Sequence, residues 1–316
     1  MFLNRFVARA LPLTVALLVA CGESTTPPTS VPPATFDAPH ALAITSPMTA
    51  VFDQNIFQSF SATLSYSEQF FRAGTTTPLP AHGVTYVYDP VERYVVDPTA
   101  TDAPAPGARF ILYAWDGSVG HPVFPLQRIG YVDITPQSAS ADGQQATHMA
   151  IVRDVPAATI ADFVIAHGVV SGVNAFSLVG FGTDGSMRVN ITVTGTYSGP
   201  AGAHRLLYTS TLAAPSIGVV STQQLISTQL SASQTGQSEL TYESHKLTDE
   251  SVSNTGAEVK FDGVLYARVI ASTFGNPTQY LKADGTALTQ REIDDLQAVL
   301  VRPAVAHFFW MNLAWP

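Results

Sequence analysis

Cysteine, lysine and charged residues as a whole are scarce in this sequence. Cys21 is the only cysteine among the 316 residues, so a disulfide framework is excluded. The only lysines are Lys246, Lys260 and Lys282, and the formal net charge is −9. Proteins that bind nucleic acid carry a basic footprint, which this acidic chain does not have the residues to form. We therefore expect no nucleic-acid partner.

Asp, Glu, Lys and Arg together make up 12% of the chain, about half of the share that is usual in soluble domains. Exposed helix faces are normally rich in these residues, whereas strands accept Ser, Thr, Asn and Gln on their solvent side. The apolar share of 46% is still large enough to bury a sizeable core. The composition therefore favours a β-rich globular protein.

Short signatures of catalysis, metal binding and nucleotide binding are also absent. The chain has no Gly-x-Ser-x-Gly, His-Glu-x-x-His, Cys-x-x-Cys or Gly-x-x-x-x-Gly-Lys string. Asp184-Gly185 and Asp284-Gly285 lack the further ligands of a calcium loop and predict turns. His245 and Glu243 are two residues apart on an expected strand, without a third partner for a metal. We expect no enzymatic activity, no cofactor and no metal site.

The N-terminus has the pattern of an export signal. Arg5 and Arg9 precede an apolar run, Ala10 to Val19, which is too short to span a bilayer as a helix. The run ends in Leu18-Val19-Ala20-Cys21, which resembles the lipobox of bacterial lipoproteins. This resemblance implies cleavage before Cys21, acyl chains on that residue and anchoring to a membrane. Because Gly22 follows the cysteine, it also implies the outer membrane of a double-membraned bacterium, facing either the periplasm or the cell surface.

Four segments are expected along the chain. Residues 1–20 are the signal peptide, and residues 21–39 are a Thr/Ser/Pro-rich tether that cannot bury enough apolar surface to fold. Residues 40–285 are an antiparallel β domain, and residues 286–316 are a helical apolar tail packed on the sheet.

The region from about residue 42 to 282 is dominated by alternation of apolar and polar residues. In residues 186–195 the apolar side chains occupy every second position, which predicts a strand with one dry and one wet face. Gly182-Thr183-Asp184-Gly185 predicts a hairpin before it. One wet face per strand indicates antiparallel pairing. The fold class is therefore all-β with a C-terminal helix, a long meander forming a curved sheet, a half-barrel or a two-sheet sandwich. Residues 159–167 fit a short helix as an alternative.

The tail has a helical signature. Thr289-Gln290-Arg291-Glu292 matches a capping box, and Pro303 is expected to end or kink the helix at Arg302. Its apolar residues either supply the core of the sheet or form an apolar patch for a ligand, a membrane or a partner. The candidate residues for this packing or binding surface are Phe308, Phe309, Trp310 and Trp315.

Three functions remain open at this point. A non-catalytic binding or carrier module for an apolar ligand predicts a cavity between the sheet and residues 289–310. A surface structural or protein-interaction lipoprotein predicts a filled core, with binding by loops such as 97–107 and 116–126. A hydrolase of envelope polymers predicts a cleft with converging carboxylates or a Ser–His pair. The expected partners are the membrane, through Cys21, and an apolar ligand or an envelope protein.

Overall fold

The structure is a computed structural model that describes nine stretches of the chain. These are residues 35–67, 82–91, 93–137, 144–170, 172–198, 205–228, 233–252, 256–271 and 277–314. The signal peptide, Cys21, most of the expected tether and Trp315 lie outside the described residues. Lipidation of Cys21 therefore stays a prediction.

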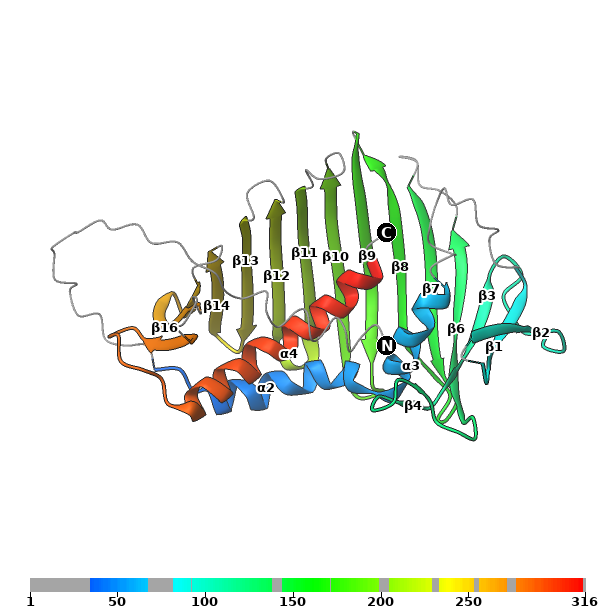
Figure 1. Ribbon diagram of the computed structural model, residues 1–316, viewed down its shortest axis with the longest axis horizontal. Helices are drawn as coiled ribbons and strands as arrows, with labels where there is room; N and C mark the ends of the chain where they lie inside the picture. The colour runs from blue at the N-terminus through cyan, green and yellow to red at the C-terminus, as the bar shows by residue number, and fades with distance from the viewer. Residues whose placement is uncertain are drawn as a thin grey trace. The chain divides into compact units, whose positions relative to one another are not determined.

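Fifteen strands of the described residues form one long sheet, shown in Figure 1. Its order is β17-β16-β15-β14-β13-β12-β11-β10-β9-β8-β7-β6-β3-β1-β2, so from β6 to β17 each strand lies beside the next strand of the described chain. Two short strands, β4 and β5, pair separately. The strands are β1 (Val84–Asp89), β2 (Arg93–Asp97), β3 (Ala108–Tyr113), β4 (Trp115–Asp116), β5 (His121–Pro122), β6 (Arg128–Gln137), β7 (Gln145–Arg153), β8 (Ala158–Val170), β9 (Val173–Thr183), β10 (Arg188–Ser198), β11 (Arg205–Ala214), β12 (Val219–Thr228), β13 (Ser233–Tyr242), β14 (His245–Val252), β15 (Gly256–Phe261), β16 (Val264–Ile270) and β17 (Gln279–Lys282).

The predicted fold class, an all-β meander with a C-terminal helix, is confirmed. The pairs with a resolved register are antiparallel, apart from β1 and β3, which run parallel and make the sheet mixed. The order is open, with β17 at one end and β2 at the other, so the two-sheet sandwich is wrong. The helical alternative for residues 159–167 is also wrong, because they belong to strand β8 and pair with β7 and β9.

Two helices near the start of the described chain were not predicted. Helices α2 (Ala38–Ala50) and α3 (Asn55–Ser67) flank the 3-10 turn η2 (Val51–Asp53), largely within the region that was assigned to the antiparallel β domain. In α3, the buried residues Ile56, Phe57 and Phe60 occur at helical spacing. That spacing predicts a helix, but the surrounding Ser and Thr residues resemble those of the strands.

Helix α4 (Gln290–Ala314) begins where the capping box predicts. The backbone N–H and the hydroxyl of Thr289 each donate to Glu292 Oε2 at 2.8 Å, and the Glu292 N–H donates to Thr289 Oγ1 at 3.3 Å. The expectation that the helix ends at Arg302 is wrong, since α4 continues through Pro303. Proline removes one helical hydrogen bond, and burial of Val299 and Ala306 on either side supplies packing that offsets this loss.

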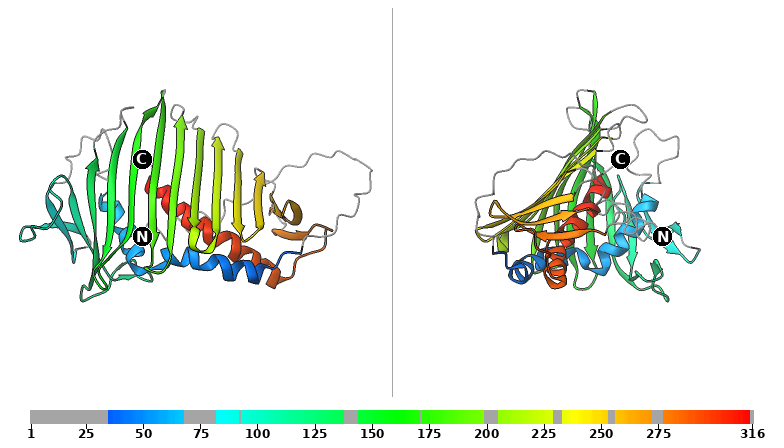
Figure 2. Two further views of the ribbon diagram at one scale, coloured as in Figure 1. Left: turned by 180° about the vertical axis from the view of Figure 1, so that it is seen from behind. Right: turned by 60° about the vertical axis from the view of Figure 1, so that its left-hand side comes forward.

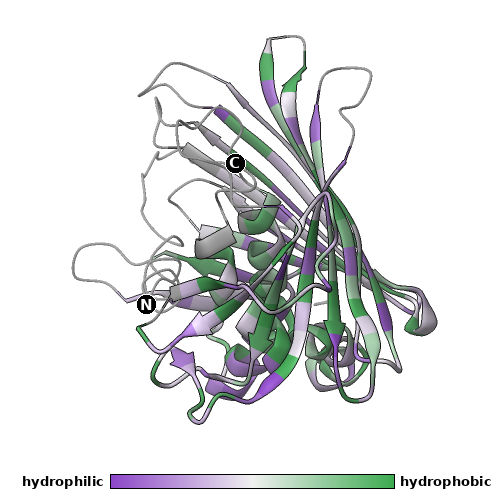
Figure 3. Ribbon diagram, turned by 90° about the vertical axis from the view of Figure 1, so that its right-hand side faces the viewer, coloured by the Kyte–Doolittle hydropathy of each residue, from purple (hydrophilic) through white to green (hydrophobic). Residues whose placement is uncertain are grey.

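The chain divides into two compact units. Unit 1 contains residues up to Ser46, Tyr197–Thr209 and Ile217–Val305, and unit 2 contains Pro47–Thr196, Ser210–Ser216 and the residues from Ala306 onward. In unit 2, strand β10 alternates fully between buried and exposed positions from Arg188 to Thr196. Figure 3 shows hydrophobic and hydrophilic residues interleaved along the strands of the sheet. A cluster of large buried side chains lies in its core and contains Phe57, Phe60, Phe163 and Trp310.

In unit 1, strands β12–β14 have two different faces. Leu240 and Leu247 are opposite each other on neighbouring strands and are buried, which identifies the face that we call the inner face. Figures 1 and 2 show α2 and α4 on one side of these strands, and none of the described helices of unit 1 on the other. The opposite face, called the outer face, carries charged pairs such as Lys260–Glu250 at 2.8 Å. The inner face is therefore the side of these strands that is shielded from solvent.

Candidate functional site

The predicted surface at the C-terminus forms part of the core of unit 2. Trp310 is fully buried, and its ring centre lies 5.3 Å from that of Phe163 and 5.4 Å from that of Phe52. Phe309 is half-buried and contacts Trp310 edge-on at 4.9 Å, and Phe308 is also half-buried. These contacts are those of packed core aromatics. The tail therefore supplies core to the sheet, and Trp310 is not part of an exposed apolar patch.

A Ser–His pair of the type expected for a hydrolase does occur in unit 2. Nδ1 of His307 lies 2.7 Å from Oγ of Ser210, and both side chains are buried. Burial lowers the pKa of His307 to about 3, which keeps the imidazole neutral at physiological pH. A nucleophile must meet its substrate, and Ser210 is fully enclosed. The geometry fits a structural hydrogen bond between α4 and β11.

His245 and Glu243 do not share a strand face. Glu243 lies in the turn between β13 and β14, with a positive φ of 52°, and its carboxylate is 3.4 Å from His40. His245 instead pairs through Nδ1 with Asp262 at 2.8 Å. The expectation that both lie on one strand face is wrong, because a turn at Glu243 and Ser244 divides the expected strand into β13 and β14.

The two Asp-Gly pairs form turns, as predicted. Asp184 Oδ1 accepts hydrogen bonds at 2.8 Å from the backbone N–H and the hydroxyl of Ser186, and Gly185 has a positive φ of 100°. Asp284 makes the same contacts with Thr286. Among the described residues, no three or more His, Cys, Asp or Glu side chains are placed to hold a metal ion.

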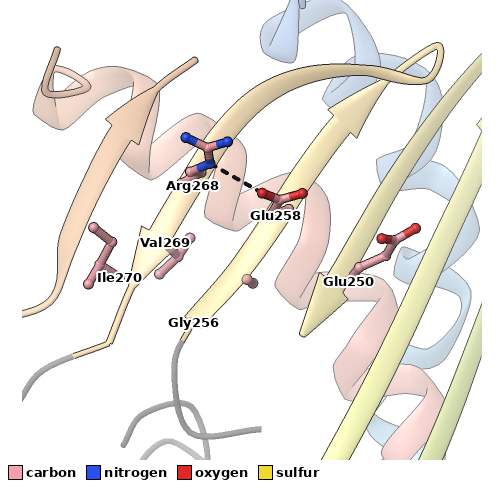
Figure 4. A pocket seen from close by; sticks show the side chains of 7 residues that line it. Glu250, Gly256, Glu258, Arg268, Val269 and Ile270 are labelled. Atoms are coloured by element: carbon pink, nitrogen blue, oxygen red, sulfur yellow. Dashed lines mark hydrogen bonds and ion pairs between the residues drawn. The ribbon is translucent and has the colours of Figure 1, made fainter. Parts of the chain in front are cut away.

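A hollow opens at the ends of β15 and β16 in unit 1, and Figure 4 shows its lining. Arg268 Nε donates to Glu258 Oε1 at 3.2 Å across these two strands. Glu250, on β14, accepts from Lys260 at 2.8 Å. The charged side chains of this hollow are therefore already paired, either with one another or with Lys260, which argues against a ligand site there.

A second candidate lies on the inner face of unit 1, where three polar residues form a cross-strand row. Ser238 of β13 is directly opposite Gln223 of β12 on one side and Asp249 of β14 on the other. Directly paired residues of neighbouring strands point to the same face, and residues two apart on one strand do so as well. This row, called the polar row, is therefore on the same face as Leu240 and Leu247.

Two oxygen atoms of the polar row are buried without a hydrogen-bond donor in the part of the chain that the structure describes. They are Oε1 of Gln223 and Oδ1 of Asp249. Burial raises the pKa of Asp249 to about 6, and the nearby negative charge of Glu250 adds to this effect. Buried polar atoms of native proteins are nearly always paired with protein, water or a ligand. The polar row therefore lacks donors that a bound molecule can supply.

Small and apolar residues surround the polar row on the inner face. The next row along the strands contains Gly236 and Ser251, and a Cβ atom on Gly236 would lie only 2.8 Å from Ser251 Oγ. The apolar neighbours in register with these rows are Leu225, Val259, Ala257, Ala267 and Val269. Small side chains project little from a sheet, so this part of the inner face combines apolar surface with two acceptors.

The polar row was not predicted from the sequence. Its signal is a polar residue at a core-facing position, because Asp249 follows Leu247 at an interval of two residues. In Thr248-Asp249-Glu250-Ser251, however, polar residues occupy both faces, so alternation alone cannot tell which of them faces the core. The register with β12 and β13 was needed to bring Gln223, Ser238 and Asp249 together.

Comparisons with protein-family models, curated proteins and solved structures found no match to this chain. Among the helices that the structure describes, none combines the length and apolar character required to cross a membrane.

Proposed function

We propose that this protein is a lipid-anchored lipoprotein of the bacterial envelope that binds an amphipathic small molecule with a large apolar part, without catalysing a reaction. The lipobox-like segment that ends at Cys21 supports export and anchoring. The observation that carries the binding function is the polar row, with its two buried acceptors that lack donors beside apolar and small residues. Ligand sites commonly combine a mostly apolar lining with a few placed polar groups.

The distribution of charge in unit 1 supports the inner face as the binding surface. Outer-face side chains pair with one another, as in Lys246–Glu239 and Lys260–Glu250. Such partly exposed pairs are compatible with water and leave no acceptor unsatisfied. The inner face has the opposite character, since its leucines are buried while the carboxylate of Asp249 has no ion-pair partner among the described residues.

Native mass spectrometry of the full chain, purified from a bacterial envelope, tests this proposal. We expect the native spectrum to show an added mass, from a small molecule with a large apolar part that co-purifies with the protein and is lost on denaturation. Ser238→Trp places a large side chain at the centre of the polar row, between Gln223 and Asp249, and is expected to abolish this mass. Gln237→Trp is the matched control, because the neighbouring position is exposed and faces the other side of β13. Retention of the mass by both variants would refute the site.

A second candidate function is protein interaction through the loop between β4 and β5. Val119 and Phe124 in or beside this loop are 57% and 50% exposed, and exposed apolar side chains that adjoin one another can mark an interaction site. The loop is fastened to helix α3, since Asn55 accepts from the Trp115 N–H and donates to its carbonyl, both at 2.7 Å. A native spectrum that contains only the mass of the protein, without a bound ligand, would favour this function.

A further inference from the structure

We propose that the polar row of unit 1 selects amphiphiles whose head is a protonated amine, with the Asp249 carboxylate as the main acceptor and the Gln223 amide oxygen as the second. This inference rests on the proposed function, because it names the head group of the ligand that the inner face binds.

The hydrogen-bonding capacity of the polar row determines the chemistry of the head group. Both unsatisfied atoms, Gln223 Oε1 and Asp249 Oδ1, are acceptors. An ammonium group offers three donors and no acceptor, an alcohol offers one donor, and a carboxylate offers none. A carboxylate head would also bring a second negative charge to Asp249. An ammonium group therefore complements the row best.

The spacing of the row suits a small head group. Gln223 and Asp249 flank Ser238 from its two neighbouring strands, and adjacent strands are about 4.8 Å apart. Ser238 is short, so a group placed over it lies between the two longer side chains. The apolar residues beyond the row, Leu225 and Val269, then lie where an alkyl chain can extend.

Two lysine side chains near the polar row already form ion pairs with carboxylates other than that of Asp249. Lys260 projects from the outer face and pairs with Glu250. Lys282, at the end of the same register on β17, pairs with Glu292 of α4 at 2.9 Å. A ligand ammonium would supply the positive charge that these lysines do not bring to Asp249. Hydrogen bonds to a charged partner in a desolvated site are stronger than those between neutral groups.

Three ligands with the same alkyl chain test the inference. Decylamine, decanol and decanoate are titrated into the full chain by calorimetry at neutral pH, below their micelle concentrations. We expect decylamine to bind at least about tenfold more tightly than the other two. Tighter or equal binding of decanoate would overturn the head-group selection while leaving the proposed function standing. Failure of all three to bind would overturn the proposed function as well.

Variants separate the role of Asp249 from general attraction between a cation and an acidic protein. Asp249→Asn keeps the size of the side chain and is expected to lower decylamine affinity about tenfold or more, with decanol affinity little changed. Glu258→Gln removes one negative charge from the neighbouring strand on the outer face and is expected to leave decylamine affinity unchanged. Equal losses in both variants would show that net charge, rather than Asp249, attracts the amine.

Discussion

Trp310 places a large aromatic side chain inside a cluster of rings, where its indole N–H has no acceptor among the described residues. Trp310→Ala leaves a large cavity and is expected to lower the free energy of unfolding by about 3–5 kcal/mol. Trp310→Phe keeps most of the packing and removes the unsatisfied N–H, so we expect a smaller loss of about 1–2 kcal/mol. Urea denaturation followed by circular dichroism measures both. Equal losses would show that ring packing does not stabilise this helix end.

Asp249 is expected to make stability depend on pH in an unusual direction. Its pKa is raised from 3.8 to about 6, so the folded state binds the proton more tightly than the unfolded state. The stabilisation is therefore present below about pH 4 and is lost as the pH rises through 6. Asp249→Asn is expected to stabilise the protein by about 2–3 kcal/mol at pH 8 and hardly at all at pH 4. Urea denaturation at both pH values checks this.

Asp184 provides the control for this measurement. Backbone and side-chain hydrogen bonds, chiefly from Met187 and Ser186, lower its pKa although partial burial opposes them. For this residue stability is lost as the pH falls, so Asp184→Asn should destabilise the protein at pH 8. If Asp249→Asn and Asp184→Asn changed the free energy of unfolding at pH 8 in the same direction, the environments inferred for the two carboxylates would be contradicted. A gain from Asp249→Asn would also show that this carboxylate is retained at a cost in stability, as is common at functional sites.

At the scale of elements, contact between the helical layer and the sheet of unit 2 depends on a glycine. A Cβ atom on Gly182 of β9 would lie 2.6 Å from the Phe52 ring, which itself packs edge-on against Phe57 and Trp310. The ring has little room to move, so we expect Gly182→Ala to lower the free energy of unfolding by about 1–3 kcal/mol. Gly117→Ala is the control, since its nearest neighbour would be 3.9 Å away, and it should change stability by less than about 0.5 kcal/mol. If urea denaturation gave equal losses for Gly182→Ala and Gly117→Ala, the tight contact between Gly182 and the Phe52 ring would be refuted.

Elements with strong local signals were predicted well. The hairpin at Asp184-Gly185 and the capping box at Thr289 depend on contacts within a few residues, which short sequence strings encode. Helices α2 and α3 were missed, because Ser and Thr are frequent in both helices and strands of this chain. Pro303 was expected to end or kink α4, but tertiary burial on both sides lets the helix continue.

At the scale of the whole molecule, attachment to the membrane is predicted to depend on Cys21. Cys21→Ser removes the thiol that the lipobox interpretation predicts to be acylated, so the variant should move from the membrane fraction to the soluble fraction of the envelope. Fractionation and immunoblotting measure this, with Ser24→Ala as a control that should remain membrane-bound. A membrane-bound Cys21→Ser protein would contradict the lipobox interpretation.

The sequence by itself determined the features that depend on composition or on neighbouring residues. Alternation along strands such as β10 identified an all-β protein, whereas export stays a prediction from the lipobox-like string at Cys21. The tertiary structure decided the rest, because strand register joins residues that are far apart in the chain. Only the pairing of β12, β13 and β14 brings Gln223, Ser238 and Asp249 into one row, and only packing of the chain shows that Trp310 is buried.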